Sequence, residues 1–276
     1  MSMLEITDLV CGYGNDFCLD QVNITIEEGA FTGIIGPNGS GKSTLFKAIA
    51  SDIPIRSGSV RLAGKDTTAL SLKERARMLS VVTQFQELSP ITVEEFVLMG
   101  RTPYRGNFQF FNSREDYQIV NYFIELTGIT HLRHKRITEL SGGEQQMASI
   151  ASALAQEPKL LLLDEATSHL DITHQIRIMN LLQELNETRG LTIAMIIHDL
   201  SLAGEFCSNL VMMKKGKVYD QGTPKEVLTY QNIEAVYETV VVVNSNPISN
   251  NPVVFPIAKR RLDECKTNAQ LHTGVK

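Results

Sequence analysis

A glycine-rich segment followed by lysine and serine has the residue types and spacing of a phosphate-binding loop. Residues 36–43 match the pattern G-x-x-x-x-G-K-S, whose glycines let successive backbone N–H groups turn toward one anion. The lysine can reach the terminal phosphates of a nucleotide, and the serine hydroxyl can bind Mg²⁺. We therefore predict that ATP binds here. The predicted contacts are Gly36, Pro37, Asn38, Gly39, Ser40, Gly41, Lys42, Ser43 and Thr44.

An apolar run that ends in two adjacent carboxylates supplies a second part of such a site. Residues 160–163 are four leucines, and Asp164 and Glu165 follow them. We expect Asp164 at the carboxyl end of a strand beside the phosphate loop, where it would hold Mg²⁺ directly or through water. Glu165 would then polarise a water in line with the γ-phosphate. A strand that ends in two solvated acids is common, but the phosphate loop favours the catalytic interpretation.

The elements around these residues predict an α/β fold. Residues 31–35 form a compact apolar run that leads into the glycine loop, and a helix is predicted from about residue 44 to 51. Residues 4–10 and 22–27 alternate apolar and polar positions, as half-buried strands do, with a loop at 12–15 between them. Because strands and helices then alternate along the chain, we predict a mostly parallel sheet covered on both faces.

The middle of the chain differs in character from its ends. Residues 92–99 and 114–127 have helical spacing, and we predict a helical subdomain at about 85–155 inserted in the nucleotide-binding core. The core and its insertion would form one domain over residues 1–256, followed by a polar tail at 257–276. Residues 240–243 form a short apolar run that predicts a buried strand.

Composition narrows the function classes. The chain has 276 residues and a formal net charge of −5, which disfavours nucleic acid as a partner because nucleic-acid binders usually carry a basic stripe. The four cysteines form no C-x-x-C pair or zinc-like cluster and are expected to be reduced thiols. The acidic N-terminus does not resemble a signal peptide, and no apolar run approaches the roughly 20 residues that span a bilayer.

Residues 140–146, Leu-Ser-Gly-Gly-Glu-Gln-Gln, resemble the L-S-G-G-Q signature motif of ATP-binding cassette (ABC) ATPases. The order of motifs from the phosphate loop to His198 also fits that family, and the resemblance runs from about residue 4 to 256. It implies a P-loop NTPase core with a mostly parallel sheet, an N-terminal antiparallel β subdomain and an inserted helical subdomain. It also implies that Lys42 and Glu165 are catalytic, with ATP and Mg²⁺ as cofactors.

The resemblance implies roles for three residues outside these two motifs. Tyr13 matches the aromatic residue that stacks on adenine, although it could be an ordinary loop tyrosine. Gln84 matches the glutamine that senses Mg²⁺ and the attacking water and links the site to a membrane partner. His198 matches the histidine that contacts the γ-phosphate; taken alone, a His-Asp pair more often marks the start of a helix.

The remaining roles involve two copies of the chain. Ser141, Gly142 and Gly143 match the signature that binds the γ-phosphate of ATP held by a second copy, and Asp171 matches a loop residue that crosses the interface. The sequence departs from the family at four positions. Glu144 replaces a glutamine, Ala166 replaces a proline, and Met147 and Ser152 replace arginines. The other histidines are expected to lie on the surface or at helix caps.

Two further segments narrow the group. Residues 92–104 and 222–229 resemble the corresponding parts of the iron-chelate, haem and cobalamin uptake ATPases. Such a chain would work at the cytoplasmic face of the cell membrane with two transmembrane permease subunits and a separate substrate-binding protein. An ABC ATPase for another solute such as molybdate, an exporter ATPase, and a non-transport cassette that serves as a scaffold or nucleic-acid ATPase are the alternatives.

Overall fold

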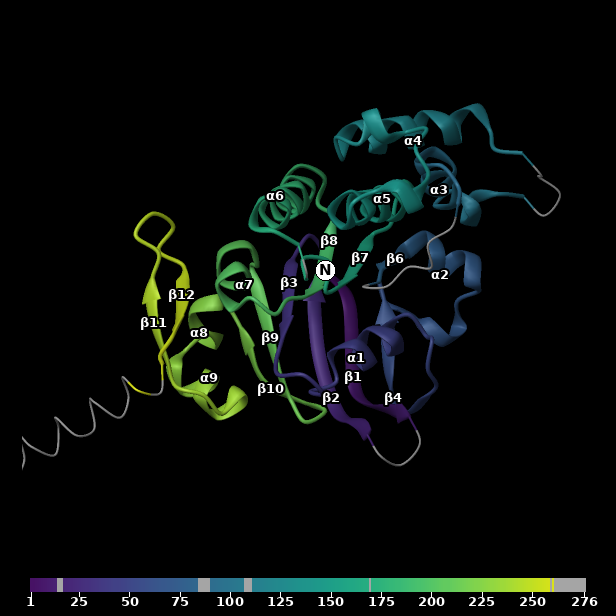
Figure 1. Cartoon of the computed structure of the whole chain (residues 1–276). Helices are drawn as coiled ribbons and strands as arrows, with labels where there is room; N and C mark the ends of the chain where they lie inside the picture. The colour runs from purple at the N-terminus through teal and green to yellow at the C-terminus, as the bar shows by residue number, and fades with distance from the viewer. Residues whose placement is uncertain (14–16, 84–89, 107–110, 169, 259, 261–276) are drawn as a thin grey trace, which may run out of the picture.

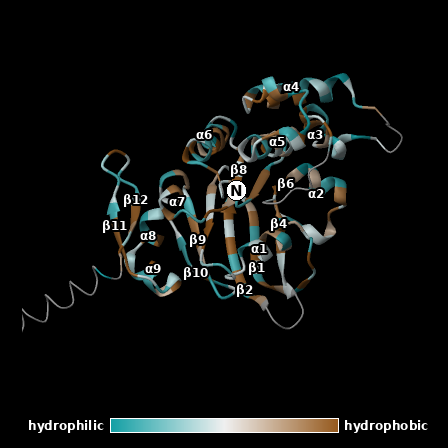
Figure 2. Ribbon diagram, viewed as in Figure 1, coloured by the Kyte–Doolittle hydropathy of each residue, from teal (hydrophilic) through white to brown (hydrophobic). Residues whose placement is uncertain are grey.

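The chain forms two packed β-sheets, a group of helices above them and a small C-terminal hairpin (Figure 1). The hydrophobic residues are concentrated along the strands in the middle of the molecule (Figure 2). The computed structural model describes residues 1–13, 17–83, 90–106, 111–168, 170–258 and 260.

A six-stranded sheet lies at the centre, in the order β10-β9-β3-β8-β7-β6. Five strands run parallel, and β10 pairs antiparallel with β9. The strands are β3 (Phe31–Ile35), β6 (Leu79–Val82), β7 (Leu160–Asp164), β8 (Thr192–Ile196), β9 (Asn209–Lys214) and β10 (Lys217–Gly222). Every residue of β3 and β8 is buried, as expected for strands covered on both faces. The mostly parallel sheet predicted from the sequence is confirmed.

The N-terminal sheet is antiparallel, as the resemblance implied, in the order β2-β1-β4-β5. Its strands are β1 (Ser2–Tyr13), β2 (Phe17–Glu27), β4 (Ile55–Leu62) and β5 (Lys65–Asp66). Helix α1 (Lys42–Ile49) belongs to a core cluster that contains residues of both sheets. The predicted loop at 12–15 begins too early, because Gly12 pairs with Cys18 and Tyr13 with Phe17. Backbone pairing can continue where the apolar alternation has stopped.

The helical insertion lies between β6 and β7. The three α-helices in its described part each begin with a capping box, in which an N-cap hydroxyl and an acid three residues later satisfy free N–H groups at the helix start. They are α3 (Val93–Met99), α4 (Arg114–Leu126) and α5 (Gly142–Ala155), joined by the 3-10 turns η2 (Thr102–Tyr104), η3 (Thr130–Leu132) and η4 (Ile137–Glu139). Among the described residues, no helix is long and apolar enough to cross a membrane.

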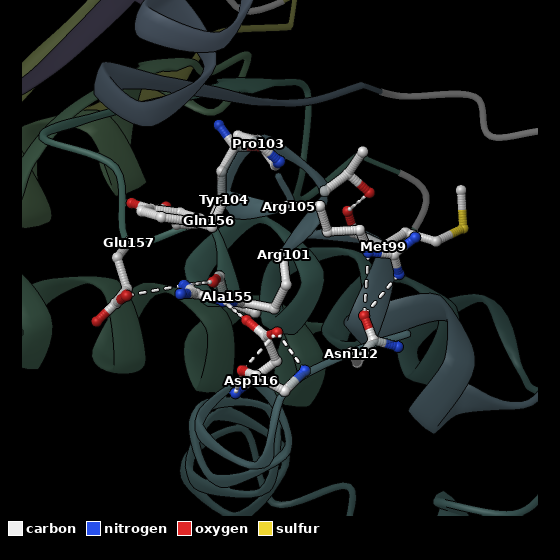
Figure 3. A network of polar contacts seen from close by, with 12 residues as sticks. Met99, Arg101, Pro103, Tyr104, Arg105, Asn112, Asp116, Ala155, Gln156 and Glu157 are labelled. Carbon is white, nitrogen blue, oxygen red and sulfur yellow. Dashed lines mark hydrogen bonds and ion pairs between the residues drawn. The ribbon is translucent and has the colours of Figure 1, made fainter. Parts of the chain in front are cut away.

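A buried arginine holds the insertion together where it meets the core (Figure 3). Arg101 is 4% exposed, and its guanidinium donates to Asp116 at 3.0 Å, to the carbonyl of Ala155 at 2.7 Å and to Glu157 at 2.7 Å. The ring of Tyr104 lies 4.1 Å from the guanidinium carbon. The network joins η2, α4 and the end of α5. Two of its members, Arg101 and Tyr104, lie in the segment 92–104, but no pattern in the sequence indicated these contacts.

A second contact set ties this insertion to the core. Turn η1 (Thr67–Ala69) and helix α2 (Leu72–Met78) follow β5. On α2, Lys73 donates to the carbonyl of Arg105 at 2.9 Å, and Arg77 donates to that of Pro103 at 3.1 Å. These contacts anchor the η2 segment to the nucleotide-binding core.

The C-terminal part of the chain ends in a hairpin that packs against α7 and α9. Its helices are α6 (Ile172–Arg189), α7 (Leu200–Phe206), α8 (Pro224–Val227) and α9 (Tyr230–Tyr237), and the strands of the hairpin are β11 (Val241–Ser245) and β12 (Pro252–Pro256). The run at 240–243 enters a strand as predicted, but the expectation that it is buried was wrong, because Val240 is 38% and Val242 46% exposed. A two-stranded sheet packed on one side leaves alternate residues on its open face. Most of the predicted tail lies outside the described residues.

Candidate functional site

The phosphate loop lies between β3 and α1, where the sequence placed it. Gly36 and Gly41 have φ angles of 148° and 106°, in the region that only glycine adopts without strain. A Cβ atom on Gly36 would also lie 2.3 Å from the carbonyl oxygen of Met213. A cavity of about 210 Å³ opens at the start of α1. It is lined by Gly39, Gly41, Lys42, Ser43, Thr44 and Glu165.

Lys42 lies inside this loop and is 5% exposed. Its Nζ donates to the carbonyl oxygens of Gly36 at 2.9 Å and Pro37 at 3.1 Å. Burial lowers the pKa of the lysine, while the carboxylates of Glu165 and Asp164 act in the opposite direction. The ammonium is therefore held at the floor of the cavity by bonds that an anionic phosphate can replace with stronger, charge-assisted ones.

Asp164 ends β7 next to the first turn of α1. The hydroxyl of Ser43 donates to its Oδ1 at 3.3 Å. Burial raises the pKa of Asp164, and the neighbouring Glu165 raises it further, while the Ser43 hydrogen bond lowers it. The structure thus brings together two of the residues predicted to bind Mg²⁺, as an oxygen pair of the kind that hard cations prefer.

Replacing Asp164 by Asn is expected to stabilise the nucleotide-free protein. The pKa of Asp164 is raised, so the folded state disfavours the charged carboxylate. The free energy of unfolding therefore falls as pH rises from the pKa of Asp164 in the unfolded chain to its higher pKa in the folded chain. Asparagine removes the charge and keeps an oxygen for the Ser43 bond. We expect the Tm at pH 7 to rise by about 2–4 °C, equivalent to ~1 kcal/mol.

Thermal unfolding without nucleotide, measured from pH 4 to 8, checks this prediction. The gain should shrink as pH falls, because both states of the wild type then bind the proton. Asp52→Asn, at an exposed carboxylate after α1, is the matched control and should change little. A lower Tm for Asp164→Asn at pH 7 would contradict the expectation.

Glu165 and His198 meet at the carboxyl ends of neighbouring strands. His198 follows β8, which pairs in parallel with β7, and its Nε2 lies 2.6 Å from Oε1 of Glu165. Glu165 has a φ of 55°, a left-handed conformation that non-glycine residues seldom adopt. Its carbonyl accepts from the N–H of Ser168 at 3.0 Å. The next residue, Ala166, is 1% exposed, so the usual proline position is a tightly packed one.

The signature residues begin a different helix. Ser141 is the N-cap of α5, its hydroxyl donates to Glu144 at 2.8 Å, and it accepts from the N–H of Glu144. Hydrogen bonds from the Ser141 backbone and hydroxyl lower the pKa of Glu144. The departure from glutamine at this position thus places a carboxylate in the capping box. None of Ser141, Gly142 and Gly143 lines the cavity at the phosphate loop.

The other two departures lie inside the helical insertion. Met147 is 2% exposed and belongs to its hydrophobic core. The hydroxyl of Ser152 donates to the carbonyl of Phe96 at 3.1 Å and so joins α5 to α3. Two positions that usually carry arginine therefore serve packing between the helices in this chain.

The remaining predicted residues lie at the edges of the site. Asp171 is the N-cap of α6 and accepts from the N–H of His174 at 2.9 Å. Asp199, which follows His198, caps α7, so the pair does mark the start of a helix as well. Tyr13 ends β1. Gln84 lies outside the described residues.

The sequence did not reveal what three residues do here. Gln145 and Gln175 donate their side-chain amides to loop carbonyls ahead of α5 and α6, and His174 contacts both Asp171 and the signature helix. For the glutamines a signal was available, because each lies four residues after an N-cap. His174 had been expected only at the surface or at a helix cap.

Comparisons with known proteins agree with this geometry. The family model described as ABC transporter matches residues 19–168. The ferric enterobactin transport ATP-binding protein FepC of Escherichia coli (strain K12) is 39% identical over 261 residues, which cover 94% of this chain and 96% of that protein.

Two solved structures extend the likeness to the fold. A metal-chelate type ABC transporter in an inward-facing conformation superimposes with a TM-score of 0.83 and 26% identity, over 95% of this chain and 100% of that one. A bacterial ABC transporter cassette solved as a dimer gives 0.72 and 30%, over 80% of this chain and 99% of that one. The predicted P-loop NTPase fold is thereby confirmed.

The family model covers more than half of the chain, and the identity to FepC extends over nearly all of it. The chain therefore belongs to the ABC transporter family, as an ATP-binding subunit that hydrolyses ATP.

Proposed function

We propose that this chain powers an importer of metal chelates, with ferric siderophores as the leading class of solute. The hydrolytic part rests above all on one observation, the Glu165–His198 pair 2.6 Å apart beside the phosphate loop. The solute class is supported by FepC, whose name refers to ferric enterobactin, and by the metal-chelate type transporter of the same fold. The segment at 92–104 supports the same group.

The proposed mechanism assigns one task to each group. Lys42 exchanges its two carbonyl partners for phosphate oxygens. Ser43 and Asp164, together with Gln84, would hold Mg²⁺, which when bound would neutralise charge on the phosphates. Glu165 accepts a proton from the attacking water, and His198 holds the γ-phosphate once nucleotide is bound. Catalysis is then mainly positioning and charge stabilisation.

We propose that two copies sandwich two ATP molecules. The signature residues 141–143 and Asp171 lie outside the cavity of their own chain, which suits a role at the site of a second copy. A small hydroxyl and two glycines at a helix start can bind an anion. A related cassette has been solved as a dimer, and Tyr13 would stack on the adenine.

We propose that the domain is residues 1–256, with the helical subdomain at about 85–155 as its membrane-facing part. Two permease subunits would dock near Gln84 and residues 92–105 at the cytoplasmic face, and a separate substrate-binding protein would deliver the solute to them. Met99 on α3 is 57% exposed and Leu72 on α2 is 77% exposed, so two elements that adjoin η2 each present an apolar side chain for contact.

Uptake measurements test the solute class. Cells that lack this subunit are expected to lose accumulation of one labelled chelate among a ferric siderophore, haem and cobalamin. The wild-type chain should restore it, and Lys42→Ala should not. Normal accumulation of all three chelates, together with failure of the chain to co-purify with any membrane subunit, would contradict the proposal. Loss of labelled molybdate uptake instead would favour the alternative solute.

A further inference from the structure

His174 lies in the first turn of α6 and has no part in the mechanism above. Its ring Nδ1 is 2.9 Å from Oδ2 of Asp171, and its backbone N–H donates to Oδ1 of the same carboxylate at 2.9 Å. Both bonds lower the pKa of Asp171. The side chain of the histidine is 34% exposed and that of Asp171 63%. The ring is therefore fixed to Asp171, the residue of the cross-interface loop that the resemblance singled out, while the Asp171 side chain remains open to contact.

The other side of the same ring contacts the signature helix. A Cβ atom on Gly143 would lie 2.5 Å from Cδ2 of His174 and 2.9 Å from its Cγ and Nε2. Real Cβ atoms do not approach other atoms so closely, so any side chain at position 143 would displace the ring. Gly143 is thus a glycine because the histidine of its own chain packs on it.

The neighbouring glycine has a different environment. Among the residues that the structure describes, no atom lies within 4 Å of the place that a Cβ atom on Gly142 would take. The space beside Gly142 is therefore open to a group from outside the chain, such as a phosphate. The missing side chain thus leaves room for a ligand at Gly142 and room for the His174 ring at Gly143.

Two glutamines hold the backbone on either side of this contact in the same way. Gln145 donates its amide to the carbonyls of Ile137 at 3.2 Å and Leu140 at 3.0 Å, directly before the signature. Gln175 donates to those of Thr167 at 3.1 Å and Leu170 at 3.2 Å, directly before Asp171. Each loop is thus tied to its own helix, and His174 is placed to tie one helix start to the other.

We propose that His174 is a positioning residue that joins the cross-interface loop to the signature helix within one chain. The inference rests on the proposed sandwich of two copies. The two surfaces that a second copy contacts belong to different elements, the core helix α6 and the inserted helix α5. A contact that fixes their relative position in the free chain removes part of the ordering cost of association.

The experiment measures ATP-dependent dimerisation by sedimentation, in the background of Glu165→Gln to prevent turnover. His174→Ala is expected to weaken the dimer by about tenfold, the effect of losing modest preorganisation. The ATP affinity of the monomer should remain within about twofold of the parent. Its Tm should remain within about 2 °C of the parent. His174→Asn keeps a donor for Asp171 but lacks the ring over Gly143, and an intermediate loss is expected. Thr173→Ala, in the same exposed turn, is the matched control.

The outcomes separate this inference from the proposed function. If the Glu165→Gln parent dimerises with ATP and His174→Ala dimerises equally well, the positioning role is overturned while the sandwich stands. If the parent does not dimerise with ATP at any concentration tested, the sandwich itself fails, and the inference fails with it. A loss in His174→Ala with unchanged monomer affinity supports both.

Discussion

Replacing Glu165 by Gln is expected to lower steady-state ATP hydrolysis by about 10²–10⁴-fold, the usual contribution of a general base. The amide has nearly the same shape as the carboxylate but cannot accept the proton of the attacking water. Glu165 lines the cavity beside Lys42, and its carboxylate oxygen lies 2.6 Å from His198. ATP affinity should stay close to that of the wild type, because Lys42 and the loop backbone are unchanged. ATP-bound dimer should therefore accumulate.

Phosphate release and fluorescent-nucleotide binding, measured on the same preparations, check this prediction. Glu184→Gln is a matched control, because it removes an exposed carboxylate on α6 and should leave both quantities unchanged. Hydrolysis by Glu165→Gln within about threefold of the wild type would show that another group handles the water. His198→Ala would then be the next variant to measure.

The parts of the site that the sequence predicted depend on short spacings. The phosphate loop spans eight consecutive residues, and its place between a buried strand and a helix follows from an apolar run on one side and helical spacing on the other. The meeting of Glu165 with His198 also follows from general rules. Glu165 comes directly after one buried strand and His198 two residues after another, and the carboxyl ends of neighbouring parallel strands lie at one edge of a sheet.

The parts that it could not predict depend on contacts between distant segments. Arg101 has partners 15, 54 and 56 residues away along the chain, and no local pattern marks such a pair. The exposure of Val242 follows from the hairpin packing against α7 on one side only. The reason for Gly143 lies on another helix, although the family resemblance already marked the glycine itself. In each case the sequence shows the residue itself but does not show which distant residue it contacts.

The buried charged groups of the site lower the free energy of unfolding of the protein. Burial lowers the pKa of Lys42 and raises that of Asp164, so in both residues it disfavours the charged form. The two groups partly compensate each other, but neither forms a direct ion pair with the other among the contacts described. Charges held in this way can interact strongly with a nucleotide and its cation, because little water shields them. The rise in Tm expected for Asp164→Asn follows from the same burial, because the substitution removes one of these buried charges.

Replacing Arg101 by Met is expected to have the largest effect on stability, a loss of about 3–5 kcal/mol, because it leaves a buried carboxylate without its partner. The side chain of Asp116 is 8% exposed, and the guanidinium lies 3.0 Å from it. Burial opposes ionisation of Asp116, but hydrogen bonds from Ser113 and Arg101 outweigh this and lower its pKa. Without Arg101, the carbonyl of Ala155 also loses its donor, and Tyr104 loses the nearer of the two guanidinium groups over its ring.

Urea unfolding of the full chain measures this loss of unfolding free energy. In a separate thermal unfolding experiment, the Tm should fall by about 10 °C. Glu157→Gln is the comparison within the same network. That carboxylate is half-exposed, so its pair with Arg101 should contribute less than about 1 kcal/mol. In the double variant Arg101→Met with Asp116→Leu, much of the stability should return, because replacing a buried pair by apolar groups is often nearly neutral. If Arg101→Met alone costs less than about 1 kcal/mol, the buried pair does not hold the insertion together, and packing around Tyr104 must do so instead.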